Sequence, residues 1–313
     1  MEKVKQLPAF YLRLIQHPLP LLLAVIFVTL KVWSNIAIGA SLFIGLRSGL
    51  IGLLVYGLAL GLIFLLSTKP LQKLKHPHYS LKSKYWVLFL LLNIYFFNYG
   101  SIIDVLQRQG FMPGTPLYNY LPGYAQFSIL LTSVSQWKTP ANIIGLESYM
   151  FSNIIKGQMM FVLLPLVILS TFRMQCLRTI LSGGELKPSL PFLIFFLTAF
   201  IVKGITATNF FFLLYAFLYP GFCEEFYYRG ILQPIFSDIL RSPAWGMGLS
   251  VLLFALLHLP DFIFRVYSGS LLLALSSAGN VLLFGALMSY GVYRTGMLWP
   301  WMLIHALSNV VGF

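Results

Sequence analysis

The chain is 313 residues long, 58% of them hydrophobic and 9% charged, with a formal net charge of +13 at pH 7. Soluble domains carry about 25% charged residues, so this composition excludes a fold that is surrounded by water. The Lys and Arg residues stand mostly between apolar segments and form no basic face interleaved with aromatic residues, so we predict no nucleic-acid partner.

Residues 1–18 combine apolar side chains such as Phe10 and Leu14 with the basic residues Lys3, Lys5 and Arg13. This mixture is typical of a short helix that lies on the membrane surface before the first span.

Apolar stretches of membrane-spanning length recur from residue 19 to the C-terminal end. A span must satisfy its backbone hydrogen bonds internally, and these stretches are continuous rather than alternating, so helices are expected and not a barrel. Residues 36–46 are apolar but contain glycine, and they either extend the first span or lie along the interface. We predict an all-α, polytopic transmembrane helical bundle of about eight to nine spans, at residues 19–35, 48–67, 85–103, 157–172, 188–205, 207–235, 244–260, 271–293 and 297–312.

The connections between the spans predict the orientation. Residues 68–84 contain five lysines and no acidic residue, and Lys and Arg are enriched in cytoplasmic loops. Residues 173–187 are also basic, which agrees with the same orientation. We therefore predict a multi-pass protein of the inner or plasma membrane with a cytoplasmic N-terminus and an extracytoplasmic loop at residues 104–156.

Two of the eight acidic residues, Glu224 and Glu225, are adjacent in an apolar stretch. An ionisable group at membrane depth costs about 3 kcal/mol on insertion scales and is a functional hypothesis by default. Arg229 stands four residues after Glu225, so on an α-helix the two side chains share a face and can pair. Glu224 points about 100° away, and a structural ion pair therefore leaves this carboxylate unexplained.

Two later predicted helices carry further polar groups in apolar surroundings. Phe254 stands one helical turn before His258, and His305 stands one turn before Asn309. A single helical histidine is usually a packed side chain, but polar groups on three apolar helices have few reasons to exist unless they meet. We predict that Glu224, His258, His305 and Asn309 form one site.

The three motifs, Glu224-Glu225-x-x-x-Arg229, Phe254-x-x-x-His258 and His305-x-x-x-Asn309, stand in an order that resembles the CPBP family. These are the intramembrane glutamic endopeptidases related to the type II CAAX prenyl proteases, also called Abi proteins. The resemblance covers about residues 188–313, which it identifies as a catalytic core following an N-terminal transmembrane region at 1–187. It implies hydrolysis of a peptide bond in a peptide or membrane-protein substrate near the surface of the lipid bilayer.

The resemblance also implies roles for individual residues, and no cofactor. Glu224 and His258 would bind and deprotonate a water molecule, and His305 and Asn309 would donate hydrogen bonds to the developing oxyanion. Glu225, Arg229 and Phe254 are expected to support these groups.

Two other readings stay open on the residues alone. Glu224, His258 and His305 would satisfy a zinc site with two histidines, one glutamate and an open position, although the helical HExxH signature is absent. A non-catalytic membrane scaffold or a proton-relay transporter would also place carboxylates and histidines on facing helices.

Overall fold

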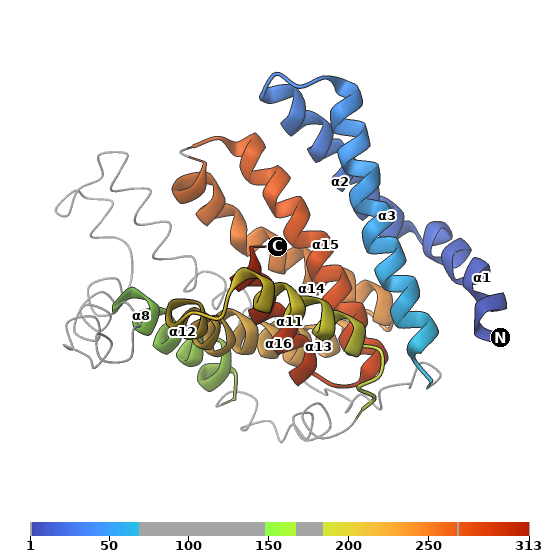
Figure 1. The fold of residues 1–313 in the computed structure, drawn as a ribbon. Helices are drawn as coiled ribbons and strands as arrows, with labels where there is room; N and C mark the ends of the chain where they lie inside the picture. The colour runs from blue at the N-terminus through green and yellow to red at the C-terminus, as the bar shows by residue number, and fades with distance from the viewer. Residues whose placement is uncertain (1, 69–147, 167–183, 268, 313) are drawn as a thin grey trace. The chain divides into compact units, whose positions relative to one another are not determined.

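The computed structural model describes residues 2–68, 148–166, 184–267 and 269–312, and these are helical apart from short turns (Figure 1). No strand occurs in these ranges, so the predicted all-α fold is confirmed. The predicted span at 85–103 lies outside the described residues, as does the predicted loop at 104–156 up to residue 147.

The chain divides into two compact units. The described residues of the first unit are 2–68, 184–190, 228–267 and 269–298, and those of the second are 148–166, 191–227 and 299–312.

The first unit begins with helix α1 (Glu2–Gln16), which is separate from helix α2 (Pro18–Ala37). His17 breaks the two helices apart because a residue before proline is pushed to an extended backbone, here with φ −78° and ψ 125°. The hydroxyl of Tyr11 on α1 donates to the Gly57 carbonyl at 3.0 Å. The short helix that the composition predicts is therefore present and is held against α3 (Leu42–Leu66).

Residues 36–46 extend the first span only by residues 36 and 37. Helix α2 ends at Ala37, and α3 begins at Leu42, six residues earlier than the predicted start at residue 48. Ser41 accepts a hydrogen bond from the Ile44 amide at 3.3 Å and so caps the start of α3. The stretch is thus a tight connection between two antiparallel helices.

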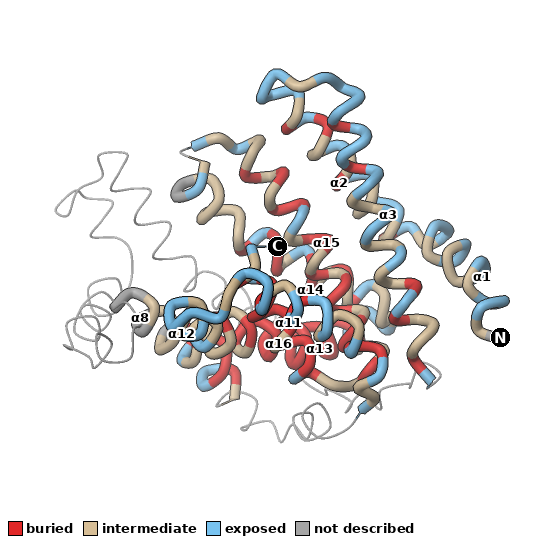
Figure 2. The backbone as a smooth tube through the Cα atoms, in the orientation of Figure 1, coloured by how far each residue is buried: buried red, intermediate tan, exposed pale blue. Residues whose placement is uncertain are grey.

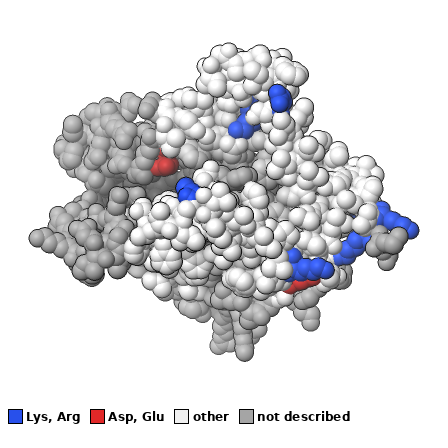
Figure 3. Space-filling model, in the orientation of Figure 1, with Lys and Arg blue, Asp and Glu red and all other residues white. Residues whose placement is uncertain are grey.

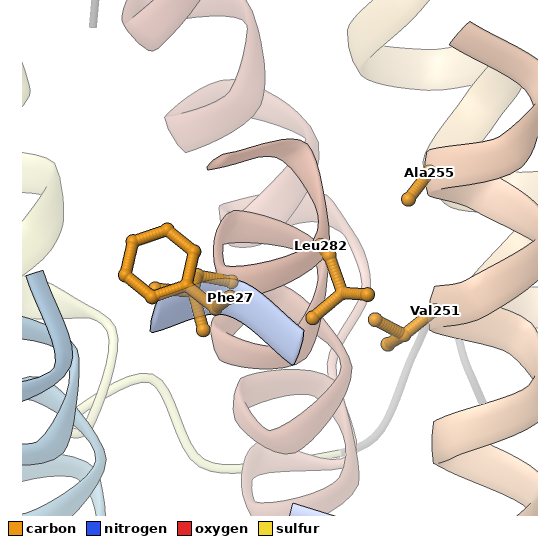
Figure 4. Packing of buried hydrophobic residues seen from close by; sticks show 5 residues of the cluster. Phe27, Val251, Ala255 and Leu282 are labelled. Atoms are coloured by element: carbon orange, nitrogen blue, oxygen red, sulfur yellow. The ribbon is translucent and has the colours of Figure 1, made fainter. Parts of the chain in front are cut away.

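Two later helices of the first unit pack on α2. Helices α14 (Pro243–Asp261) and α15 (Leu271–Thr295) share a buried apolar cluster with α2, in which Leu282 of α15 points toward Val251 of α14 (Figure 4). Phe27 is the contribution of α2 to this cluster. The short elements of this part are α13 (Gln233–Ile239) and η4 (Phe262–Val266).

The second unit consists of shorter helices. Its described elements are α8 (Ser148–Gly157), η1 (Gln158–Leu163), α11 (Leu190–Lys203), α12 (Ala207–Ala216), η2 (Phe217–Glu224) and α16 (Trp299–Val311). The predicted span at 207–235 is not one α-helix, because α12 continues into η2, then into η3 (Phe226–Leu232) and α13.

Four described helices are long and apolar enough to cross a membrane: α2, α3, α14 and α15. In the spanning windows of α2 and α3 only 17% of the residues are buried, against 50% in α15. Most residues of α2 and α3 are therefore exposed or partly exposed (Figure 2), and many of the exposed ones are large and apolar. Charged side chains are sparse on the described surface in the view of Figure 3. Such a surface suits lipid, and the chain is a membrane protein; the total of eight to nine spans stays a prediction.

Candidate active site

The two glutamates lie in a π-helical segment. Element η2 ends at Glu224, and η3 begins immediately after Glu225. Each backbone hydrogen bond of a π-helix joins residues i and i+5. The Cys223 thiol forms a bond with the same spacing, because it donates to the Leu218 carbonyl at 3.3 Å. The predicted 100° separation of Glu224 and Glu225 and the predicted i, i+4 stacking of Glu225 and Arg229 both assume an α-helix. That assumption is wrong here, because the segment is π-helical. The ion pair between Glu225 and Arg229 stays a prediction.

His305 of α16 contacts both carboxylates within the second unit. Its Nδ1 lies 2.8 Å from Oε1 of Glu225, and its Nε2 lies 3.9 Å from Oε2 of Glu224. All three side chains are buried, and Glu225 is completely so. The contact of Nδ1 with Glu225 orients the ring with Nε2 toward Glu224.

A glycine allows this approach of η2 to α16. A Cβ atom on Gly221 would lie 2.6 Å from the Met302 carbonyl, closer than real Cβ atoms come to backbone, and it would also be tight against the Ala306 side chain at 3.2 Å. Only a residue without a side chain lets the turn before the glutamates touch the turn that carries His305.

The two ends of α16 are also held. Trp301, which is completely buried, packs on Phe192 of α11 with ring centroids 5.7 Å apart. Lys203 at the end of α11 donates to the Val310 carbonyl, which satisfies an acceptor in the last turn of α16. The position of His305 is therefore fixed by contacts along the whole helix.

Asn309 differs from His305 in its surroundings. It lies one turn after His305 on α16, and its side chain is exposed rather than buried with the glutamates. An exposed carboxamide remains accessible to a substrate, and its role as an oxyanion donor stays a prediction.

Arg229 is held by α15 and α14 in the first unit. It is 1% exposed, its Nε donates to the Ser289 hydroxyl at 3.3 Å, and its terminal nitrogen donates to the Gly285 carbonyl at 3.2 Å. The guanidinium lies over the Phe254 ring at 4.2 Å from the centroid, where a cation is attracted by the ring face. Gly285 leaves room for this, since a Cβ there would lie 3.1 Å from the guanidinium.

His258 follows Phe254 by one turn of α14, and the two side chains are in contact as their spacing predicts. The ring centroids are 4.8 Å apart, and Nδ1 lies 2.7 Å from the Phe254 carbonyl oxygen. A carbonyl can only accept, so Nδ1 carries the proton, and in the neutral imidazole Nε2 keeps a lone pair. The His258 side chain is half-buried.

The predicted residues are thus brought together in two groups. Glu224, Glu225 and His305 meet in the second unit, while Arg229, Phe254 and His258 meet in the first. The joint site of all four predicted catalytic residues stays a prediction.

Sequence reasoning missed two features of these groups. It did not find the contact between Glu225 and His305, which are 80 positions apart, nor the role of Ser289 and Gly285 in holding Arg229. No local signal marks them, because small residues are common in packed transmembrane helices.

No group of three or more His, Cys, Asp or Glu side chains in the described ranges is arranged to hold a metal ion. The zinc alternative is therefore a matter for experiment.

Comparison with known families agrees with the motifs. Residues 206–311 match the family model described as type II CAAX prenyl endopeptidase Rce1-like. No curated protein and no solved structure matches the chain. The match contains all three motifs, so the family resemblance that they indicate is confirmed for this segment.

Proposed function

Because residues 206–311 belong to the type II CAAX prenyl endopeptidase Rce1-like family, we propose that this membrane protease hydrolyses its substrate with a water molecule activated by Glu224 and His258. The family is one of proteases, so the substrate is a peptide or protein. The observation that carries the mechanism is the buried contact of His305 with both glutamates.

The reaction starts at the carboxylate of Glu224. This group takes a proton from the water, and the water oxygen attacks the carbonyl carbon of the scissile bond. The tetrahedral intermediate then collapses, the C–N bond breaks, and Glu224 passes the proton to the leaving amine. The products are a new C-terminal carboxylate and a new N-terminus.

His258 is the second ligand of the water in this proposal. Its Nδ1–H is held by the Phe254 carbonyl, and Nε2 would accept a hydrogen bond from the other water proton. This hydrogen bond orients the oxygen lone pair toward the substrate.

His305 and Asn309 are the proposed donors to the oxyanion. Glu225 fixes the tautomer and the orientation of the His305 ring through Nδ1, so that Nε2 faces the side on which Glu224 lies. Asn309, one turn further and exposed, supplies an uncharged donor. Donors of this kind are worth about 100- to 1000-fold in rate.

The proposal also covers the orientation of the protein in the membrane and the class of its substrate. We assign the protein to the inner or plasma membrane with a cytoplasmic N-terminus, and we infer that no metal takes part. The family name makes peptides with a prenylated C-terminal cysteine the first substrate class to test.

The test uses the purified full-length chain in liposomes with a library of internally quenched peptides, prenylated and unmodified. We expect cleavage that Glu224→Gln abolishes, that Asn309→Ala lowers about 100-fold or more, and that strong chelators leave intact. Glu185→Gln is the matched control, because its carboxylate binds Thr68 instead.

Three outcomes would contradict the proposal in different ways. Chelator-sensitive cleavage with stoichiometric zinc would favour the metal mechanism. Equal cleavage by the wild type and Glu224→Gln would remove Glu224 from the chemistry. Proton flux without cleavage of any peptide would favour a transporter.

A further inference from the structure

The first unit contains a cavity of about 840 Å³ that none of the predicted catalytic residues line. Its walls come from α1, α2, α3, α14 and α15. The described residues give it two chemically different ends.

One end is apolar and borders the core of the unit. Leu23, Leu53, Val251 and Leu282 line it, and the last two belong to the buried cluster of Figure 4. Along α15 the lining residues run from Leu282 to Arg294, which is about 18 Å at 1.5 Å per residue. The cavity is therefore long enough to take much of one hydrocarbon chain of a lipid, laid along the helices.

The other end is basic, and Arg13, His17 and Arg294 line it. These residues stand at the same end of the unit, because Phe10 of α1 stacks on Phe64 at 4.6 Å and lies 6.0 Å from Tyr290 of α15. The walls thus change from apolar to cationic along one direction, as the surface of an amphiphile does.

Arg294 has an unused hydrogen-bond donor at this end. Its guanidinium lies over the rings of Phe64 and Tyr290, at 5.4 and 6.0 Å. Its Nε is buried and has no hydrogen-bond partner among the described residues. A buried donor without an acceptor is costly, and an anionic oxygen would remove this cost while pairing with the charge.

We propose that this cavity binds an anionic membrane lipid, with one chain along the apolar end and the phosphate beside Arg294 and Arg13. Two further observations favour a bilayer lipid as the occupant. Helix α1, which forms one wall, combines apolar and basic side chains as surface-lying helices do. The basic end also coincides with the predicted cytoplasmic side, where anionic head groups attract Lys and Arg.

One residue, Ser289, connects the proposed lipid site to Arg229 of the family motif. Ser289 lines the cavity, and its hydroxyl accepts the hydrogen bond from Nε of Arg229. A bound chain therefore packs against the wall that holds this arginine, and lipid binding is expected to stabilise the folded first unit.

The experiment compares two lipids with identical chains, phosphatidylglycerol and phosphatidylcholine, titrated into the delipidated full-length protein and counted by native mass spectrometry. We expect one phosphatidylglycerol to bind about tenfold more tightly than phosphatidylcholine, and Arg294→Gln to remove this preference. Arg47→Gln is the matched control, because Arg47 is an exposed arginine on α3 that does not line the cavity.

A second pair of variants tests the cavity itself. Ala24→Phe places a ring in the lining and is expected to weaken the binding of both lipids, whereas Ala37→Phe at the exposed end of α2 leaves binding unchanged. Equal binding of the two lipids by the wild type would overturn the proposal, as would the same loss in Arg47→Gln as in Arg294→Gln. Circular dichroism of each variant confirms that the helices are intact.

Discussion

The adjacent glutamates have different surroundings at the scale of single residues. Spacing predicts that Glu225 pairs with Arg229, and the structure shows a contact of Glu225 with His305, whose Nδ1 lies 2.8 Å from Oε1. A buried carboxylate that holds an imidazole decides which ring nitrogen faces the reacting groups. We therefore propose Glu225 as a positioning residue for His305 as well as a candidate ion-pair partner of Arg229.

The first prediction concerns this contact. Glu225→Gln keeps the size of the side chain but replaces an obligate acceptor by an amide that also donates, so the ring can be held in the wrong tautomer. We expect kcat for peptide cleavage to fall about 100-fold or more, with KM nearly unchanged and an altered pH profile. Steady-state kinetics across pH measures all three.

The control for this prediction is again Glu185→Gln, which removes a carboxylate whose hydrogen bonds go to Thr68. A wild-type kcat and pH profile in Glu225→Gln would show that the contact with His305 has no role in the reaction. The thermal unfolding of both variants separates this effect from a loss of folding.

At the scale of elements, the π-helical turns η2 and η3 are the main departure from a regular bundle. Pro220 lies inside η2 and has no backbone N–H to donate. Gly221 follows it and lets η2 touch α16. The two residues that weaken an α-helix here are the ones that allow the glutamates to approach His305.

The second prediction tests this close approach. Gly221→Ala adds a Cβ that would lie 2.6 Å from the Met302 carbonyl, so α16 must move away from η2. We expect a destabilisation of about 1–3 kcal/mol and a loss of peptide cleavage, measured by unfolding in detergent and by the quenched-peptide assay.

Gly57→Ala is the matched substitution, since a Cβ at Gly57 in α3 meets nothing within 4 Å. There the better helix propensity of alanine is expected to leave stability unchanged or raise it by up to about 1 kcal/mol. Equal effects of the two substitutions would mean that the packing of η2 on α16 does not depend on Gly221.

At the scale of the whole molecule, the predicted orientation in the membrane rests on the distribution of charge. Basic residues cluster in the predicted cytoplasmic segments, and the described helices α2 and α3 present mostly apolar surface between the ends. Within the first unit, the turn after α2 and the end of α15 lie at opposite ends of the spans, because the N-terminal part of α15 packs near the C-terminal part of α2.

The third prediction uses these two positions. In a variant without Cys176 and Cys223, a cysteine at Gly39 is expected to react with a membrane-impermeant maleimide in intact cells. A cysteine at Gly296 is expected to react only after the cells are opened. The reverse pattern would invert the orientation and with it the side on which the basic end of the cavity lies.

The sequence by itself determined the membrane class, most helix positions and the residues of the three motifs. It could do so because apolar runs, proline and capping residues act locally. In addition, placing the polar motif residues at membrane depth costs free energy whichever residues they pack against. The predicted start of α3 was wrong, and the helical span predicted at 207–235 contains π-helical turns, since helix ends and π-helical turns depend on packing partners.

Only the tertiary structure decided which polar groups touch. Residues far apart in the chain meet in the contact of Glu225 with His305 and in the hydrogen bonds of Arg229 to Ser289 and Gly285. The cavity with its basic end is also lined by residues far apart in the chain. Such contacts follow from the way helices pack and from the few positions where a glycine lets them come close, which no local pattern of residues encodes.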